Sequence, residues 1–156
     1  RFHWVDPIAP ATAERMQAAA RDLVAPFRGN PYRIGYFSDN EMSWGDDTSL
    51  AIAALRSPPA QVAKKAFVAD LKAKYSDIAK LNAAWGAKHA SWDALLESRE
   101  APDKKMAHAD LTRFYTKTAQ TYFRTIKEAI QAVAPHQLYL GCRFAWVNDL
   151  AAKAAA

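Results

Sequence analysis

The chain has 156 residues, 51% of them hydrophobic and 12% aromatic, so it carries enough apolar side chains for a packed core and is not a disordered segment. Its single cysteine, Cys142, excludes an internal disulfide and a cysteine-based zinc site. The net charge of +5 would suit an anionic partner, but the basic residues are scattered along helical stretches, so no nucleic-acid partner is expected.

Signals for a metal, a cofactor or a membrane are also missing. The four histidines are widely spaced and match no metal-ligand pattern, so each is expected to be a surface or capping residue: His3, His89, His108 and His136. No apolar run approaches the roughly 20 residues of a membrane span, and no signal peptide is visible. We therefore expect no metal, no cofactor and no membrane partner.

The first part of the chain predicts a helix, a turn and a strand. A helical pattern runs from about residue 11 to residue 24 and is ended by Pro26. Asn30 and Pro31 mark a turn, and the β-forming residues 32–37 predict a short strand that stops at the polar residues 38–41.

Helical signals dominate from there to about residue 135. Asp47 or Thr48 is expected to cap a short helix that ends near Arg56, and Ser57 with Pro58 matches the N-cap and first turn of the next helix. Two more short helices are expected, one that starts at residues 76–77 and stops at Gly86, and one at residues 91–96.

A longer helix is expected from about residue 103 to residue 133, because apolar positions recur there with a period of 3.6: Leu111, Phe114, Tyr115, Thr118, Tyr122, Ile126, Ile130 and Val133. Pro135 closes this helix, and residues 137–144 predict a second strand. Asn148 is a plausible N-cap for a final helix-like segment.

Two strands joined through helices are expected to be parallel neighbours. The apolar runs at residues 34–37 and 138–140 suit strands covered on both faces, but two strands alone cannot bury such faces. The missing strands come from unseen parts of the same chain, from a partner copy, or from a fold other than the one inferred. The last helix has no stop signal, which favours the first source and a middle slice of a larger α/β protein.

Residues 38–45 carry the candidate chemistry. Glu41 follows Asn40 at the end of a strand, where parallel-barrel enzymes hold their active sites, and Trp44 would supply a flat apolar surface. A glycosidase needs such a carboxylic acid, polar groups for the sugar hydroxyls and a stacking ring. By spacing alone, a polar turn that caps the next helix is the commoner explanation. A metal loop would use the acidic positions of this region but lacks calcium-hand spacing: Asp39, Glu41, Asp46 and Asp47.

A family resemblance favours the glycosidase explanation over the polar turn. Residues 34–45 resemble the fourth strand of clan A glycoside hydrolases, where Asn-Glu closes the strand and Glu is the acid/base. The longer pattern Ile-Gly-Tyr-Phe-x-Asp-Asn-Glu-x-x-Trp-Gly is most similar to the family 50 β-agarases, and the related family 42 β-galactosidases share a shorter version. Residues 67–86, with Tyr75, Leu81-Asn82 and Trp85-Gly86, resemble a helical insert of both families, and residues 138–146 resemble the fifth agarase strand.

The resemblance implies an α/β fold, a partial (β/α)₈ barrel of about strands 4–5 with a long helical insert. Residues 1–156 would be the central segment of one catalytic domain, incomplete at both ends. The implied activity is retaining cleavage of β-galactosidic linkages in agarose-like galactans, in the extracellular space or the periplasm. Glu41 would be the general acid/base and Asn40 would bind the hydroxyl beside the reacting carbon. The other implied substrate-binding residues are Asp39, Trp44, Arg143 and Trp146.

One departure concerns the nucleophile, which in such enzymes is a Glu that ends the seventh strand. Nothing after Trp146 matches it, and the remaining candidates lie in helical or linking segments: Glu97, Glu100 and Glu128. The expected partners are therefore a polysaccharide or oligosaccharide and the remainder of the barrel, without which the segment is inactive. Two alternatives stay open, a β-galactosidase of the same clan and a non-catalytic helical module that binds an anionic polymer.

Overall fold

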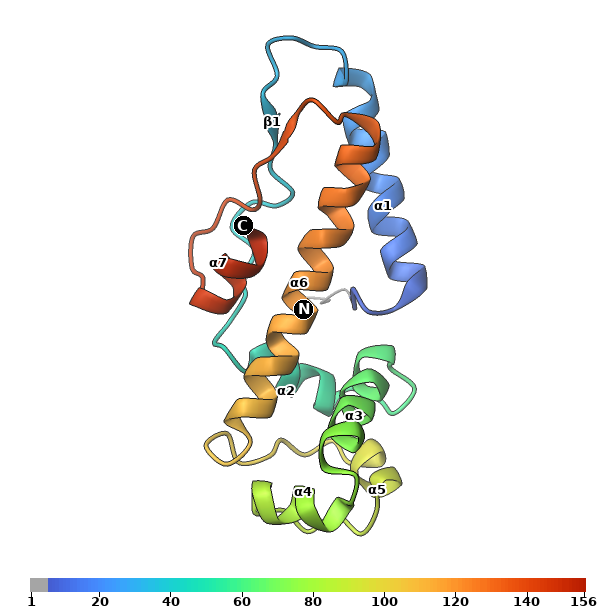
Figure 1. The fold of residues 1–156 in the computed structure, drawn as a ribbon, viewed down its shortest axis with the longest axis vertical. Helices are drawn as coiled ribbons and strands as arrows, with labels where there is room; N and C mark the ends of the chain where they lie inside the picture. The colour runs from blue at the N-terminus through green and yellow to red at the C-terminus, as the bar shows by residue number, and fades with distance from the viewer. Residues whose placement is uncertain (1–5) are drawn as a thin grey trace. The chain divides into compact units, whose positions relative to one another are not determined.

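The structure, a computed structural model, describes residues 6–156, so the expectation for His3 lies outside the described residues. The chain divides into two compact units. Of the described residues, unit 1 comprises 6–44 and 118–156, and unit 2 comprises 45–117. The described residues form seven α-helices, one 3₁₀ helix and two short parallel strands (Figure 1). None of these helices is both long enough and apolar enough to cross a bilayer.

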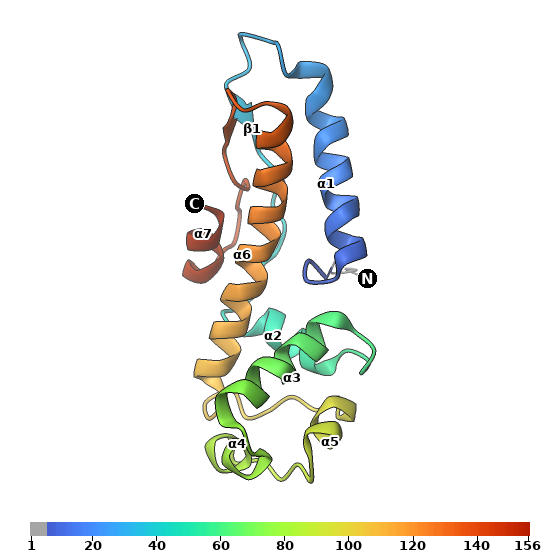
Figure 2. The same ribbon diagram turned by 45° about the vertical axis from the view of Figure 1, so that its right-hand side comes forward.

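Unit 1 contains both strands and the helices that precede and follow them. α1 (Pro10–Val24) continues into the 3₁₀ helix η1 (Ala25–Phe27), which confirms the predicted first helix to within one residue. α1 lies beside the C-terminal part of α6 (His108–Val133) in both ribbon views (Figure 1, Figure 2). α7 (Asp149–Ala155) begins at the predicted cap, since the Asn148 side chain accepts from the amides of Leu150 and Ala151.

The two strands are parallel neighbours, as predicted. β1 (Gly35–Tyr36) pairs with β2 (Leu138–Tyr139), with Gly35 opposite Leu138. Both strands are shorter than the sequence suggested, because the regular ladder stops near Ser38. The amide of Ser38 donates to the carbonyl of Gly141, a residue at φ +76°, which only glycine adopts readily.

The two strands alone do not bury their apolar side chains, as expected. Tyr36 is buried, but three apolar side chains in or next to the strands are exposed, by 49 to 73%: Ile34, Phe37 and Leu138. The described residues thus cover only part of the strand surface, because one two-stranded ladder with helices α1 and α6 cannot enclose both faces.

Unit 2 is helical. It contains α2 (Ser49–Arg56), α3 (Val62–Tyr75), α4 (Ile78–Trp85), α5 (Trp92–Glu97) and the residues of α6 up to Lys117. Its core is aromatic, with the rings of Phe67 and Phe114 stacked at a centroid distance of 4.2 Å and Trp85 within 6.4 Å of Phe67. The predicted stripe of α6 is buried through Leu111, Phe114 and Tyr115 in this unit.

Two helix starts differ from the prediction, and in a third helix the start is as predicted but the capping side chain is another. Thr48 occupies the N-cap position of α2, but the capping contacts are made by the carboxylate of Asp46. α3 starts at Val62 after Gln61, and not at Ser57-Pro58, because Pro58 precedes a second proline and is held out of the helical region. α6 starts at His108, since the Asp103 carboxylate accepts from two following amides and forms a separate turn.

The insert motif has a structural centre that the sequence did not reveal, Asp110. Its carboxylate, only 5% exposed, accepts from the hydroxyl of Tyr75 at 2.7 Å, from the indole of Trp85 at 2.9 Å and from Lys74 at 2.6 Å. Burial raises the pKa of Asp110, but these three donors together outweigh it and hold the pKa below its ordinary value. The conspicuous Tyr and Trp of the insert therefore hold α3 and α4 to α6.

Candidate active site

The candidate site lies in unit 1, at the C-terminal end of the paired strands. Asn40 forms an isolated parallel bridge with Arg143. The amide of Arg143 donates to the carbonyl of Asp39 at 3.0 Å, and the amide of Glu41 donates to the carbonyl of Arg143 at 2.7 Å. The structure thus brings residues 39–41 and Arg143 to one rim, as the sequence predicted from the two strand ends.

Glu41 has an unusual backbone. Its φ of +54° lies in the left-handed region, which costs a residue with a side chain about 1–2 kcal/mol. The hydrogen bond from its amide to Arg143 holds it there. Glu41 itself is exposed, as are Asn40 and Arg143. The backbone of Glu41 is thus fixed in an uncommon conformation, and its side chain is exposed at the open strand end.

Asp39 sits behind this rim in a network of hydroxyl groups. One carboxylate oxygen accepts from the phenol of Tyr122 at 2.7 Å, and the other accepts from Ser38 at 2.9 Å. The Ser38 hydroxyl oxygen also lies 3.1 Å from the phenol oxygen of Tyr139. Since a carboxylate only accepts, Tyr122 donates its proton to Asp39, while the single proton of Ser38 has two acceptors within reach, Asp39 and the carbonyl of Gly141 at 3.1 Å. Both carboxylate oxygens of Asp39 are therefore within hydrogen-bond distance of a hydroxyl group.

Both phenols of the network keep their protons. Burial, followed by the charge of Asp39, raises the pKa of Tyr122 far above its ordinary value. Burial also raises the pKa of Tyr139 to about 12. At neutral pH both phenols are therefore protonated, and Tyr122 donates to Asp39 while Tyr139 lies within hydrogen-bond distance of Ser38. Neither is suited to act as a base there.

Trp44 does not lie where the sequence suggested. Its side chain is 2% exposed, stacks on Phe123 with ring centroids 4.8 Å apart and meets Tyr122 edge-on at 5.4 Å. The expectation that Trp44 flanks a sugar is therefore corrected. Its indole is used in the unit 1 core, because two aromatic side chains of α6 cover it. Trp146, by contrast, is 78% exposed and follows Arg143 by three residues.

Cys142 is buried next to the same cluster, and its thiol is protonated at neutral pH. Burial and then the charge of Asp39 raise the pKa of its thiol to about 11, against a smaller opposite effect of a hydrogen bond with Trp44. A thiol with this pKa is protonated at neutral pH, and the thiolate is the reactive form.

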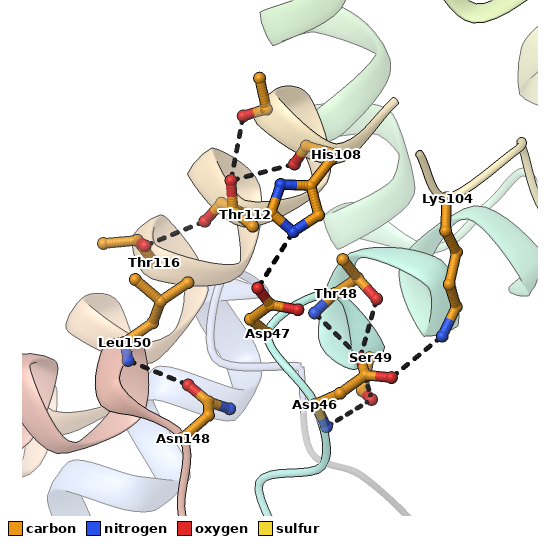
Figure 3. A network of polar contacts seen from close by, with 11 residues as sticks. Asp46, Asp47, Thr48, Ser49, Lys104, His108, Thr112, Thr116, Asn148 and Leu150 are labelled. Carbon is orange, nitrogen blue, oxygen red and sulfur yellow. Dashed lines mark hydrogen bonds and ion pairs between the residues drawn. The ribbon is translucent and has the colours of Figure 1, made fainter. Parts of the chain in front are cut away.

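Asp46 and Asp47, which follow Trp44-Gly45, each make polar contacts within unit 2 (Figure 3). Asp46 accepts from Thr48, Ser49 and Lys104, and these contacts, the one with Lys104 foremost, hold the pKa of Asp46 well below its ordinary range. Asp47 lies 3.1 Å from the imidazole of His108. In residues 6–156 no group of three or more His, Cys, Asp or Glu side chains is arranged to hold a metal ion.

Gly45 explains part of the Trp-Gly motif. Its φ is +62°, and a β-carbon at this position would lie 2.5 Å from the hydroxyl oxygen of Ser49. A side chain here would be strained by the backbone and would clash with the first turn of α2. The glycine therefore lets the chain turn between Trp44 and α2, which begins at Ser49.

The sequence pointed to Tyr122 only as a core residue and did not single out Ser38 and Tyr139. Tyr122 was one member of the helical stripe, and nothing in the stripe distinguishes a phenol that packs from one that also donates to Asp39. A buried Tyr hydroxyl usually finds a partner, but the stripe also contains Tyr115 and Thr118, so this signal did not single out Tyr122.

Comparison with known proteins identifies relatives of the chain. The family model described as "Glyco_hydro_42: Beta-galactosidase" matches residues 5–146. The chain is 36% identical to β-agarase A and 34% identical to β-agarase B of Vibrio sp. (strain JT0107), in each case over 97% of this chain and 17% of the relative. The chain thus spans about a sixth of the length of these curated relatives.

Solved structures give the same picture. "The crystal structure of an agarase, AgWH50C" superposes with a TM-score of 0.85 at 31% identity, over 96% of this chain and 23% of that one. "Structural analysis of an exo-beta-agarase" gives a TM-score of 0.86 at 33% identity, over 96% and 22%. The chain belongs to the glycoside hydrolase family described by the family 42 β-galactosidase model and is related to the family 50 β-agarases.

Proposed function

We propose that the chain is the acid/base-bearing segment of a retaining glycoside hydrolase that cleaves β-galactosidic linkages in agarose-like galactans. The observation that carries this proposal is the rim formed by Asn40, Glu41 and Arg143 at the C-terminal end of two parallel strands. Parallel-barrel enzymes hold their catalytic groups at this end. β1 and β2 would be strands 4 and 5 of a (β/α)₈ barrel, with unit 2 as a helical insert.

Each rim residue has a distinct task in this proposal. Glu41 protonates the departing glycosidic oxygen and then, as a carboxylate, takes a proton from the attacking water. Asn40 hydrogen-bonds the hydroxyl beside the reacting carbon. Arg143 and the exposed ring of Trp146 bind neighbouring sugars, and Asp39 orients the rim through its contacts with Tyr122 and Ser38.

The nucleophile would come from outside residues 1–156. Of the candidate glutamates, Glu97 is the last residue of α5, Glu128 is in α6, and Glu100 follows α5 in a segment without helix or strand. Retention needs a second carboxylate about 5–5.5 Å from the first. The complete enzyme is therefore the active species, and the 156 residues alone would not turn over substrate. We also propose that this enzyme acts outside the cell or in the periplasm.

The decisive experiment is Glu41→Gln in the complete enzyme. Cleavage of agaro-oligosaccharides, whose leaving groups are poor, should fall by about 10³-fold or more, whereas activated aryl glycosides should lose much less because they need little acid assistance. Glu128→Gln, the same change on an exposed residue of unit 1, is the matched control and should have no effect. Equal losses on both substrate types in Glu41→Gln would refute the acid role.

A β-galactosidase is the second candidate, favoured by the description of the family model that matches residues 5–146. Subsite loops decide between the two activities, and a fold shared by both does not. A panel of agaro-oligosaccharides, other β-galactans and aryl β-galactosides separates them. A preference for short aryl galactosides over agaro-oligosaccharides would support this second activity.

A further inference from the structure

One side chain of α6 contacts both ends of the segment that carries Glu41. The hydroxyl of Tyr122 donates to Asp39 at 2.7 Å, immediately before Asn40 and Glu41. The ring of the same residue lies edge-on to Trp44, at a centroid distance of 5.4 Å and an interplanar angle of 74°. Tyr122 is 8% exposed, so both contacts are made inside unit 1 and away from water.

On the side of the second strand, the backbone of Arg143 holds the start of this segment, and the Cys142 thiol hydrogen-bonds with Trp44 and with the backbone of Met42. The amide of Arg143 donates to the carbonyl of Asp39, and the carbonyl of Arg143 accepts from the amide of Glu41. These bonds fix the strand end but leave the side chain of Asp39 to be held by Tyr122 and Ser38. Glu41 sits at φ +54°, a conformation that persists only when its surroundings over-determine it.

We propose that Tyr122 is a positioning residue for the general acid, and that its phenol sets the location of Glu41 through Asp39. This inference rests on the proposed function of Glu41. An acid works within about 2.6–3.2 Å of the oxygen that it protonates, and an error of about 1 Å can cost up to about 10²-fold in rate. Tyr122 supplies the charge-assisted hydrogen bond that keeps Asp39, two residues before Glu41, from moving.

The phenol and the ring can be tested separately. Tyr122→Phe in the complete enzyme keeps the ring contact with Trp44 and removes only the hydroxyl. We expect kcat for agaro-oligosaccharides to fall about tenfold with KM nearly unchanged, and activated aryl glycosides to lose about twofold or less. A residue with a purely structural role would lower both activities equally, through the fraction of folded enzyme.

Tyr36→Phe is the matched control. Tyr36 is also a buried phenol of unit 1, and its hydroxyl donates to Gln137 at 2.7 Å, the same length as the bond between Tyr122 and Asp39. Its partner lies away from the segment that carries Glu41. Thermal unfolding should show a loss of stability in both variants, larger in Tyr122→Phe because its bond to a carboxylate is charge-assisted, but only Tyr122→Phe should show the dependence on leaving group.

A double-mutant cycle tests the route through Asp39. Asp39→Ala removes the acceptor and should reproduce the selective loss, and adding Tyr122→Phe to it should cause no further loss. If Tyr122→Phe does not fold, Asp39→Ala alone still decides, because an equal loss on both substrate types overturns the inference. Additive losses in the double variant overturn it as well.

The inference and the proposed function fail in different ways. If Glu41→Gln loses the same factor on both substrate types, the acid role itself is wrong. If Glu41→Gln shows the selective loss but Tyr122→Phe behaves like Tyr36→Phe, the acid role stands and the positioning role of Tyr122 is wrong.

Discussion

The indole of Trp44 stacks on the ring of Phe123 with centroids 4.8 Å apart and planes inclined by 29°. This contact packs Trp44, three residues after Glu41, against the middle of α6. It gives Trp44 a different physical role from Trp146, which is 78% exposed. The two tryptophans therefore allow one prediction that separates a core role from a binding role.

Trp44→Ala should destabilise the fold by about 3–5 kcal/mol, because a large buried ring is removed and a cavity remains. Trp146→Ala should change stability by less than about 0.5 kcal/mol, as is usual for surface positions. If Trp146 stacks on a sugar, its loss should raise KM about fivefold, which corresponds to about 1 kcal/mol of aromatic contact. Chemical denaturation and steady-state kinetics of the two variants measure both effects. A rise in KM without a loss of stability in Trp44→Ala would contradict its core placement.

Asp110 should matter for the stability of unit 2. Asp110→Asn weakens charge-assisted hydrogen bonds from Lys74, Tyr75 and Trp85, which should cost about 2 kcal/mol. Hydrogen exchange of α3 and α4 reports this loss locally. Asp70→Asn is the matched control, since Asp70 pairs with Lys117 at 2.7 Å but both side chains are more than 40% exposed, and such pairs contribute little.

The same residue predicts a pH dependence. The pKa of Asp110 is lower in the folded chain than the value of about 3.9 expected in the unfolded chain. Its stabilising contribution is therefore complete above the unfolded pKa and is lost as the pH falls through the folded pKa. Protection of unit 2 should decrease below about pH 4 in the unmodified protein, and less steeply in Asp110→Asn. An identical acid profile in the two proteins would show that Asp110 is not the responsible group.

Gly86 and Gly45 have nearly the same positive φ, but substitution by alanine should affect stability differently at the two positions. Gly86 caps α4 at φ +63°, and no atom lies within 4 Å of the point that a β-carbon would occupy, so Gly86→Ala should cost only the backbone strain of about 1 kcal/mol. Gly45 has φ +62°, and its β-carbon would also meet Ser49 at 2.5 Å. Gly45→Ala should therefore cost more. Equal losses of unfolding free energy in the two variants would mean that Ser49 moves aside without cost.

Local features were predictable wherever a residue acts on its own neighbours. Asp77 and Gly86 bound α4, and Asn148 caps α7, because capping depends on backbone groups two or three residues away. The same logic failed at Ser57-Pro58, where the next residue is also proline. It failed again at Asp103, whose carboxylate closes a turn ahead of α6.

The sequence by itself determined that two parallel strands end in polar residues and that Asn40 and Glu41 stand at one of those ends. These features follow from local hydrogen bonding and the alternation of apolar residues, which act over a few positions. Only the tertiary structure decided that Trp44 is buried, that Tyr122 holds Asp39 and that Asp110 joins the insert helices. Each of those contacts links residues far apart in the chain, and which of several chemically suitable partners meet depends on how the helices pack.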